Sequence, residues 1–123
     1  MTALYIALGG ALGSVLRWWL SGRVYDWLGR DFPWGTLTVN LLGGVLIGLL
    51  FVLLTERTLP DPALRAGILV GFLGGLTTFS TFSLETLALM ETGRWLAAAL
   101  NAGVSVAACV AAAALGSMLA KAL

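Results

Sequence analysis

The residues best suited to chemistry in this sequence lie in one segment, residues 71–83, which reads GFLGGLTTFSTFS. Glycines, followed by a dense run of hydroxyl side chains, interrupt an otherwise apolar stretch of chain. Glycine weakens a helix, and serine and threonine side chains can satisfy the backbone groups that a break sets free. We therefore predict a break in a helix around Gly74 to Thr78. Freed carbonyls would suit a small cation and freed N–H groups an anion, so we expect this segment to form part of an ion pathway.

A second set of polar candidates lies upstream, on one face of another expected helix. Thr36, Asn40 and Gly44 are spaced four apart, which places them on the same side of a helix. The Asn40 amide offers two N–H donors and one acceptor. It could therefore donate to a desolvated anion or make an ordinary hydrogen bond to a neighbouring helix. We favour the first interpretation and expect Thr36 to line the same path.

Two aromatic side chains follow the predicted break. Phe79 and Phe82 are three residues apart and therefore share a helical face. The edge of an aromatic ring is electropositive, so two ring edges can face an anion without binding it tightly. A conducting site needs that balance, because the ion must also leave. Ordinary packing is the alternative interpretation of this pair.

Each of the remaining polar positions in apolar surroundings allows two interpretations. Asn101, Ser105 and Cys109 are spaced four apart in a helix rich in alanine and valine, where packing and a pore wall are equally open. Arg17 either extends to the membrane interface or places a fixed positive charge at the mouth of an anion pathway. Glu85 is either exposed at the interface or paired with an arginine that the sequence does not identify.

The elements that must position these residues are membrane-spanning helices. Of the 123 residues, 59% are hydrophobic and only 11% are charged, and the mean hydropathy is +0.97. A soluble domain carries about 25% charged residues, and this chain has almost no polar face to meet water. A helix crosses a bilayer with about 20 apolar residues. We predict an all-α membrane protein with a single four-span domain over residues 1–123 and a third helix that is broken in the middle. The spans are roughly 3–22, 35–55, 63–90 and 95–120.

Basic residues give no preferred orientation in the membrane. Lysine and arginine normally gather on the cytoplasmic side, yet here they divide evenly between the two sides. We therefore predict dual topology, in which copies insert both ways and pair as an antiparallel homodimer; the alternative is that the first span alone decides the orientation. One side holds Arg57, Arg65 and Lys121, and the other holds Arg23, Arg30 and Arg94.

Small residues spaced four apart indicate close helix packing. Such pairs let helix backbones approach each other, and 16 glycines in so short a chain imply a compact bundle. Four spans cannot readily surround a pore, so we also expect an oligomer. The pairs are Gly9 with Gly13, Gly44 with Gly48, Gly67 with Gly71 and Gly71 with Gly75.

Composition also excludes several classes of function. The net charge of +1 leaves no basic patch to neutralise the phosphates of a nucleic acid. Histidine is absent and Cys109 is the single cysteine, so neither a His/Cys metal cluster nor a nucleophile–base pair can form within one chain. We therefore expect that the protein is not an enzyme.

Three motifs together resemble the Fluc (CrcB) family of fluoride channels, over essentially the whole chain. The most specific is residues 71–85, GFLGGLTTFSTFSLE, which is similar to the family's third-helix signature. Residues 32–40, FPWGTLTVN, are similar to its second-helix motif, and residues 9–17, GGALGSVLR, to its first-helix motif. Ser14 stands where alanine is more usual, and Trp18 where tyrosine is common.

The resemblance implies a passive channel that lets fluoride leave the cytoplasm and so relieves fluoride toxicity. It implies a dual-topology homodimer in the plasma (inner) membrane of a prokaryote, with two pores that are each built by both subunits. It also implies a structural sodium ion at the dimer centre, held by the main-chain carbonyls of Gly74 and Thr77, and no organic cofactor. Arg17 would lie at a pore entrance. The pore-lining residues would be Asn40, Phe79, Phe82, Ser80, Thr81 and Ser105.

One departure and one rival accompany this assignment. The family often has a tyrosine where Asn101 falls, which leaves the chemistry there open. The rival is a small dual-topology multidrug exporter, also with four short spans. That class uses an intramembrane glutamate in its first helix, where this chain offers only Arg17. A membrane assembly subunit without transport activity would explain the glycines, but not the aligned polar residues.

Overall fold

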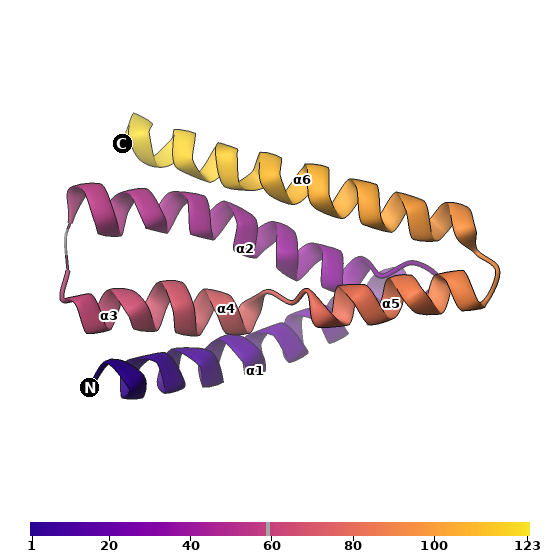
Figure 1. Cartoon of the computed structure of the whole chain (residues 1–123), viewed down its shortest axis with the longest axis horizontal. Coiled ribbons are helices and arrows are strands. Elements are labelled where there is room, and N and C mark those ends of the chain that lie inside the picture. Colours follow the sequence, from indigo (N-terminus) through magenta and orange to yellow (C-terminus); the bar gives the residue numbers. More distant parts are fainter. Residues whose placement is uncertain (59) are drawn as a thin grey trace.

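Four helical spans run back and forth along one long axis (Figure 1). The computed structural model describes residues 1–58 and 60–123, and the secondary structure of these residues is entirely helical. Both termini lie at the same end of the bundle as the connection between the second and third spans (Figure 1). The elements are α1 (Thr2–Leu28), α2 (Trp34–Val52), the π-helical segment η1 (Leu53–Arg57), α3 (Pro62–Ala66), the π-helical segment η2 (Gly67–Phe72), α4 (Leu73–Leu76), α5 (Ser80–Glu91) and α6 (Trp95–Ala122).

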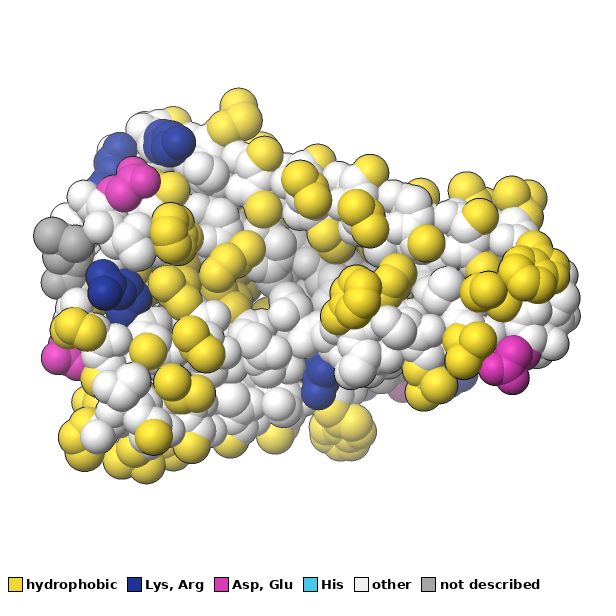
Figure 2. Space-filling view, in the orientation of Figure 1, with side chains coloured by type: hydrophobic (Ala, Val, Ile, Leu, Met, Phe, Trp, Pro, Cys, Tyr) yellow, Lys and Arg dark blue, Asp and Glu magenta, His cyan; other side chains and the backbone are white. Residues whose placement is uncertain are grey.

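The prediction of four membrane-spanning helices is confirmed. Each predicted span falls within one helical stretch that is long and apolar enough to cross a membrane. Hydrophobic side chains cover the long face shown in Figure 2, while most of the charged side chains on this face lie toward its ends. That distribution suits a bundle with lipid around its sides and water at its ends. The four stretches are Thr2–Leu28, Trp34–Arg57, Pro62–Glu91 and Trp95–Ala122.

The first helix is longer than the sequence predicted. The predicted span ended near Gly22, and residues 23–33 were expected to form a connection, but α1 continues to Leu28. The helix continues because the next residues contain neither proline nor glycine until Gly29, which has a φ of 85°. The guanidinium of Arg23 lies 5.9 Å from the ring centroid of Trp19, one helical turn away. The charged residues after Gly22 therefore extend the helix at the interface.

Glycines bring the backbones of neighbouring spans into contact. An ideal Cβ at Gly9 would lie 2.1 Å from the carbonyl oxygen of Gly67, and one at Gly48 would lie 2.0 Å from the carbonyl oxygen of Ala113. No side chain fits at such a distance, so α1 can pack directly on η2, and α2 on α6. The prediction of close packing between small residues is confirmed within the chain, whereas the oligomer stays a prediction.

The third span is broken between α4 and α5. Helix α4 ends at Leu76 and α5 begins at Ser80, and Thr77 adopts an extended conformation with ψ of 156°. The predicted break is therefore confirmed, but Gly74 and Gly75 remain helical. Gly75 is needed for packing instead, because a Cβ there would lie 2.7 Å from the carbonyl oxygen of Gly10.

Candidate functional site

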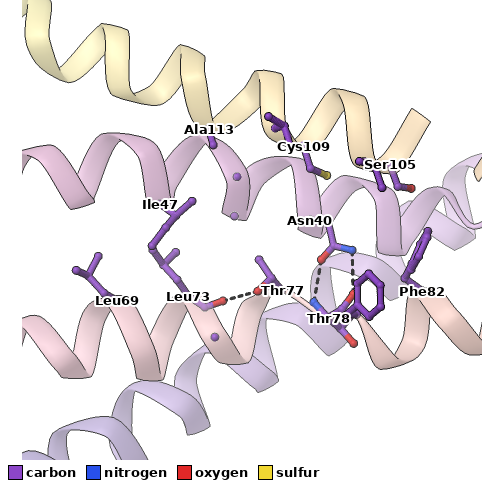
Figure 3. Close-up of a pocket in the computed structure, with 16 residues that line it drawn as sticks. Asn40, Ile47, Leu69, Leu73, Thr77, Thr78, Phe82, Ser105, Cys109 and Ala113 are labelled. Carbon is purple, nitrogen blue, oxygen red and sulfur yellow. Dashed lines mark hydrogen bonds between the residues drawn. The ribbon is translucent and has the colours of Figure 1, made fainter. Parts of the chain in front are cut away.

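The break is held open by a side chain from the second span. The backbone N–H of Thr78 donates to Oδ1 of Asn40 at 2.8 Å, and Nδ2 of Asn40 donates to the carbonyl of Thr78 at 3.0 Å (Figure 3). We call these two bonds the Asn40 clamp. A buried backbone group without a partner costs about 1–3 kcal/mol, so the amide replaces what the broken helix loses. This contact is therefore the hydrogen bond between helices that was the alternative interpretation of Asn40. The Asn40 amide has two N–H donors, and the clamp uses one of them.

Thr78 also stabilises the first turn of the following helix. Its backbone is fixed by the Asn40 clamp, and its Oγ1 accepts a hydrogen bond at 3.2 Å from the backbone N–H of Thr81. The hydroxyl of Ser80 lies 3.3 Å from the same Oγ1. A threonine that bonds an N–H in the first turn satisfies a donor that would otherwise have no helical partner. Ser80 and Thr81 are exposed on α5, so these two predicted pathway residues lie beside the break.

A groove with a volume of about 590 Å³ opens beside the clamp, between α2, the two halves of the third span and α6 (Figure 3). We call it the central groove. Its walls are mainly aliphatic, with Ile47, Leu69 and Leu73 on one side and Ala113 on the other. Few polar side chains interrupt these walls. The residues predicted as ion-pathway or sodium residues that line the groove are Asn40, Gly74, Thr77, Phe79, Phe82 and Ser105.

The two phenylalanines meet at one end of the groove. Their ring centroids are 5.2 Å apart and the ring planes are tilted by 42°. Phe82 is packed, with 9% of its surface exposed, whereas Phe79 is 75% exposed. The pair therefore combines one fixed ring with one that stands on the open side of the groove.

The polar stripe on α6 divides between packing and the groove. Asn101 is 2% exposed, and its Nδ2 donates to Oγ1 of Thr86 at 2.8 Å, which ties α6 to α5. Ser105 donates to Oδ1 of Asn101 at 3.3 Å and lines the groove together with Cys109. Of the two interpretations that the sequence left open, packing therefore describes Asn101 and a groove wall describes Ser105 and Cys109.

A second polar cluster, which the sequence did not indicate as a unit, surrounds Glu85. Tyr25 Oη and Thr36 Oγ1 each donate to a different oxygen of the Glu85 carboxylate, and the two hydroxyl oxygens lie 3.2 Å apart. Thr36 is 4% exposed and does not line the central groove. Glu85 thus bonds to two hydroxyls. The two interpretations given from the sequence were an exposed position at the interface and a pair with an arginine. The sequence analysis missed Tyr25 because residues 23–33 were expected to form a connection between two spans. The sequence signal that pointed to this cluster was the acid Glu85 inside an apolar span.

Arg17 lies apart from the central groove. It is half-buried on α1, and its carbonyl accepts a hydrogen bond at 2.6 Å from the hydroxyl of Ser21. Its guanidinium is not part of the groove lining. A role for Arg17 at a pore entrance therefore stays a prediction.

Gly74 and Thr77 both line the groove, and the break changes the backbone bonding of Gly74. In a continuous helix the N–H of Thr78 would donate to the carbonyl of Gly74. That N–H donates to Asn40 instead, so the Gly74 carbonyl is released from its helical partner. A Cβ built on Gly74 would have no atom within 4 Å, so open space adjoins this part of the backbone. Backbone carbonyls freed at a helix break are the ligands that small alkali cations find in membrane proteins.

Comparison with known proteins gives relatives of one kind, matched over most of the chain. A family model described as "CrcB-like protein, Camphor Resistance (CrcB)" matches residues 4–117. A protein of Magnetococcus marinus is 59% identical over 116 residues, which cover 94% of each chain. A protein of Geobacter metallireducens is 51% identical over 121 residues, which cover 98% of each chain. Both relatives are named "Fluoride-specific ion channel FluC".

Proposed function

The chain belongs to the CrcB family, and from that premise we propose that it is a fluoride-specific ion channel. The resemblance seen in its motifs is thereby confirmed, and so is the expectation that the protein is not an enzyme, because its relatives are named as ion channels. The structural observation that carries the proposal is the central groove, which Asn40, Ser105 and the aromatic pair line together beside the broken span.

The chemistry of the groove suits a small, strongly hydrated anion. Replacing the water around fluoride requires N–H or O–H donors, and uncharged donors release the ion more readily than a buried cation would. The second amide N–H of Asn40 supplies such a donor, and the hydroxyl of Ser105 would supply another by turning from Asn101 toward the ion. The ring edges of Phe79 and Phe82 add weak positive potential. We infer a passive path along these residues, through which fluoride leaves the cytoplasm down its gradient.

We propose further that two copies pair antiparallel in the plasma membrane and build two pores. The exposed ring of Phe79 and the open space beside Gly74 support this arrangement, because a second subunit could cover both. The even division of basic residues supports insertion in both orientations. A tag at the C-terminus, probed from each side of the membrane, should react on both sides. A tag that reacts on only one side would contradict dual topology.

Flux measurements test the proposed function directly. Purified protein is reconstituted into liposomes loaded with potassium fluoride, and efflux is followed with a fluoride electrode after a potassium ionophore is added. We expect rapid fluoride release, and little release of chloride from matched liposomes loaded with potassium chloride. Folded protein that releases no fluoride would overturn the proposal.

A further inference from the structure

A second cavity, with a volume of about 240 Å³, is lined by the connection between α1 and α2, by α5 and by the connection between α5 and α6. The α5–α6 connection lies at the end of the bundle away from the termini (Figure 1). The lining includes Arg30, Pro33, Glu85, Thr92 and Arg94, and we call it the arginine cavity. It is separate from the central groove, because the two cavities share no lining residue. Nothing in the path inferred above uses its two arginines.

Both guanidinium groups are held in place by uncharged partners. The Arg30 guanidinium lies 4.6 Å from the ring centroid of Tyr25, and Arg94 Nη1 donates to the carbonyl of Asp31. An arginine has five N–H donors, so these contacts leave most of the donors of both residues available. A cation held over an aromatic ring keeps its charge while losing freedom of movement. The cavity thus presents two positively charged side chains, each restrained by one such contact.

Glu85 lines the same cavity and is less exposed than the two arginines, and its negative charge limits how tightly an anion could bind. Its two carboxylate oxygens accept from Tyr25 and Thr36, so the acid is held by hydroxyls from α1 and α2. Two arginines without a neighbouring acid would form a trap for an anion. A carboxylate beside them weakens that attraction, and a conduction pathway requires sites that release the ion.

We propose that the arginine cavity is a capture site for a small inorganic anion, which Arg30 and Arg94 attract and Glu85 keeps from binding tightly. The proposal rests on the proposed function in taking fluoride as the anion that is collected. Tyr25 is the positioning residue of the site, because its ring packs against the Arg30 guanidinium and its hydroxyl donates a hydrogen bond to Glu85. Charged clefts of this kind raise the local concentration of an oppositely charged ion and speed its entry.

The first experiment measures binding without transport. Protein in a neutral detergent free of phospholipid is treated with phenylglyoxal, which modifies arginine, and the modification of each arginine is followed by mass spectrometry. Sodium fluoride replaces sodium gluconate at constant ionic strength. We expect fluoride to slow the modification of Arg30 and Arg94, but not of Arg23, which also stacks on an aromatic ring at 5.9 Å but does not line the cavity. Equal rates with and without fluoride, or equal protection of Arg23, would overturn the proposal.

The second experiment measures flux with Arg30→Gln, Arg94→Gln and the control Arg23→Gln. At low ionic strength and low fluoride we expect the first two variants to conduct about three- to tenfold more slowly than the control, because the attraction of the anion is lost. The difference should disappear in concentrated potassium gluconate, since salt screens exposed charges. A deficit that is equal at every ionic strength, or no deficit at all, would contradict capture by charge. If the wild-type protein shows protection by fluoride but no flux, the proposed function fails while the capture site stands.

Discussion

The carboxamide of Asn40 bonds both backbone groups of Thr78, accepting from its N–H at 2.8 Å and donating to its carbonyl at 3.0 Å. One side chain of the second span therefore completes the backbone of the third span at the point where that helix is interrupted. The remaining N–H of the same amide is the donor assigned above to the anion. Asn40 thus joins the architecture of the break to the proposed chemistry of the groove.

Replacing Asn40 with alanine should destabilise the protein. The change leaves the N–H and the carbonyl of Thr78 without partners, and we expect a loss of about 1–3 kcal/mol for each buried group. Thermal unfolding in detergent measures the effect. Thr38→Ala is the control, because that hydroxyl bonds only the Trp34 carbonyl within its own helix. An Asn40 variant as stable as the Thr38 variant would show that the clamp contributes nothing.

Replacing either phenylalanine of the pair with isoleucine should suppress fluoride flux. Isoleucine keeps an apolar side chain but removes the electropositive ring edge. Phe79→Ile should change the packing within one subunit little, because the ring is 75% exposed there, which makes it the cleaner test of the two. Phe51→Ile, at an exposed position on α2, is the control for flux. Unaltered rates in both Phe79 and Phe82 variants would remove the pair from the path.

Adding a methyl group at Gly48 should weaken the bundle. A Cβ there would lie 2.0 Å from the Ala113 carbonyl oxygen, so Gly48→Ala must push α2 and α6 apart. Gly22→Ala is the matched control, because a Cβ at that helical position has no atom within 4 Å. The control should gain about 1 kcal/mol from better helix propensity. A Gly48→Ala variant that unfolds at as high a temperature as the Gly22→Ala variant would contradict the close approach of the helices.

Removing the Tyr25 hydroxyl should destabilise the site around Glu85. Tyr25→Phe deletes one donor to the carboxylate and keeps the ring under Arg30. Hydrogen bonds to charged groups contribute about 1.5–3 kcal/mol, so a clear fall in unfolding temperature is expected. Tyr5→Phe, on the same helix, serves as the control. Equal unfolding temperatures for the two variants would mean that Glu85 does not depend on Tyr25.

Sodium should stabilise the assembled protein if the carbonyls of Gly74 and Thr77 hold it. We expect the proposed dimer to dissociate or unfold at a lower temperature when sodium is replaced by N-methylglucamine, a cation too large for the site. Size-exclusion chromatography and thermal unfolding provide the measurement. Lithium and potassium at the same concentration show whether any stabilisation is specific. Indifference to all of these exchanges would count against a sodium site.

Hydropathy was sufficient to locate all four spans, because each is a continuous apolar run that lipid requires to be helical. The exact break was not predictable from local composition. Glycine and hydroxyl residues marked the neighbourhood, yet Gly74 and Gly75 stay helical, and the interruption begins at Thr77, next to the residue that Asn40 reaches from α2. The position of the break depends on a contact between residues 38 positions apart, and the periodicity of the sequence does not predict such a contact.

The site around Glu85 shows the same limit more strongly. Its partners come from α1 and α2, 60 and 49 positions away in sequence. Tyr25 lay in a segment whose charges suggested a connection, and Thr36 shared a predicted face with Asn40. The predicted face was real, but the bundle turns its first member toward Glu85 and its second toward the break. Only the packing of three helices decides that division.

The Asn40 clamp also restricts how the length of this chain can vary. One inserted residue between Leu73 and Thr77 would turn everything after it by about 100° around the helix axis. A different backbone unit would then face the amide, and the aromatic pair would rotate away from the groove with it. We therefore expect an insertion in this stretch to break the clamp, whereas a substitution there leaves its register unchanged.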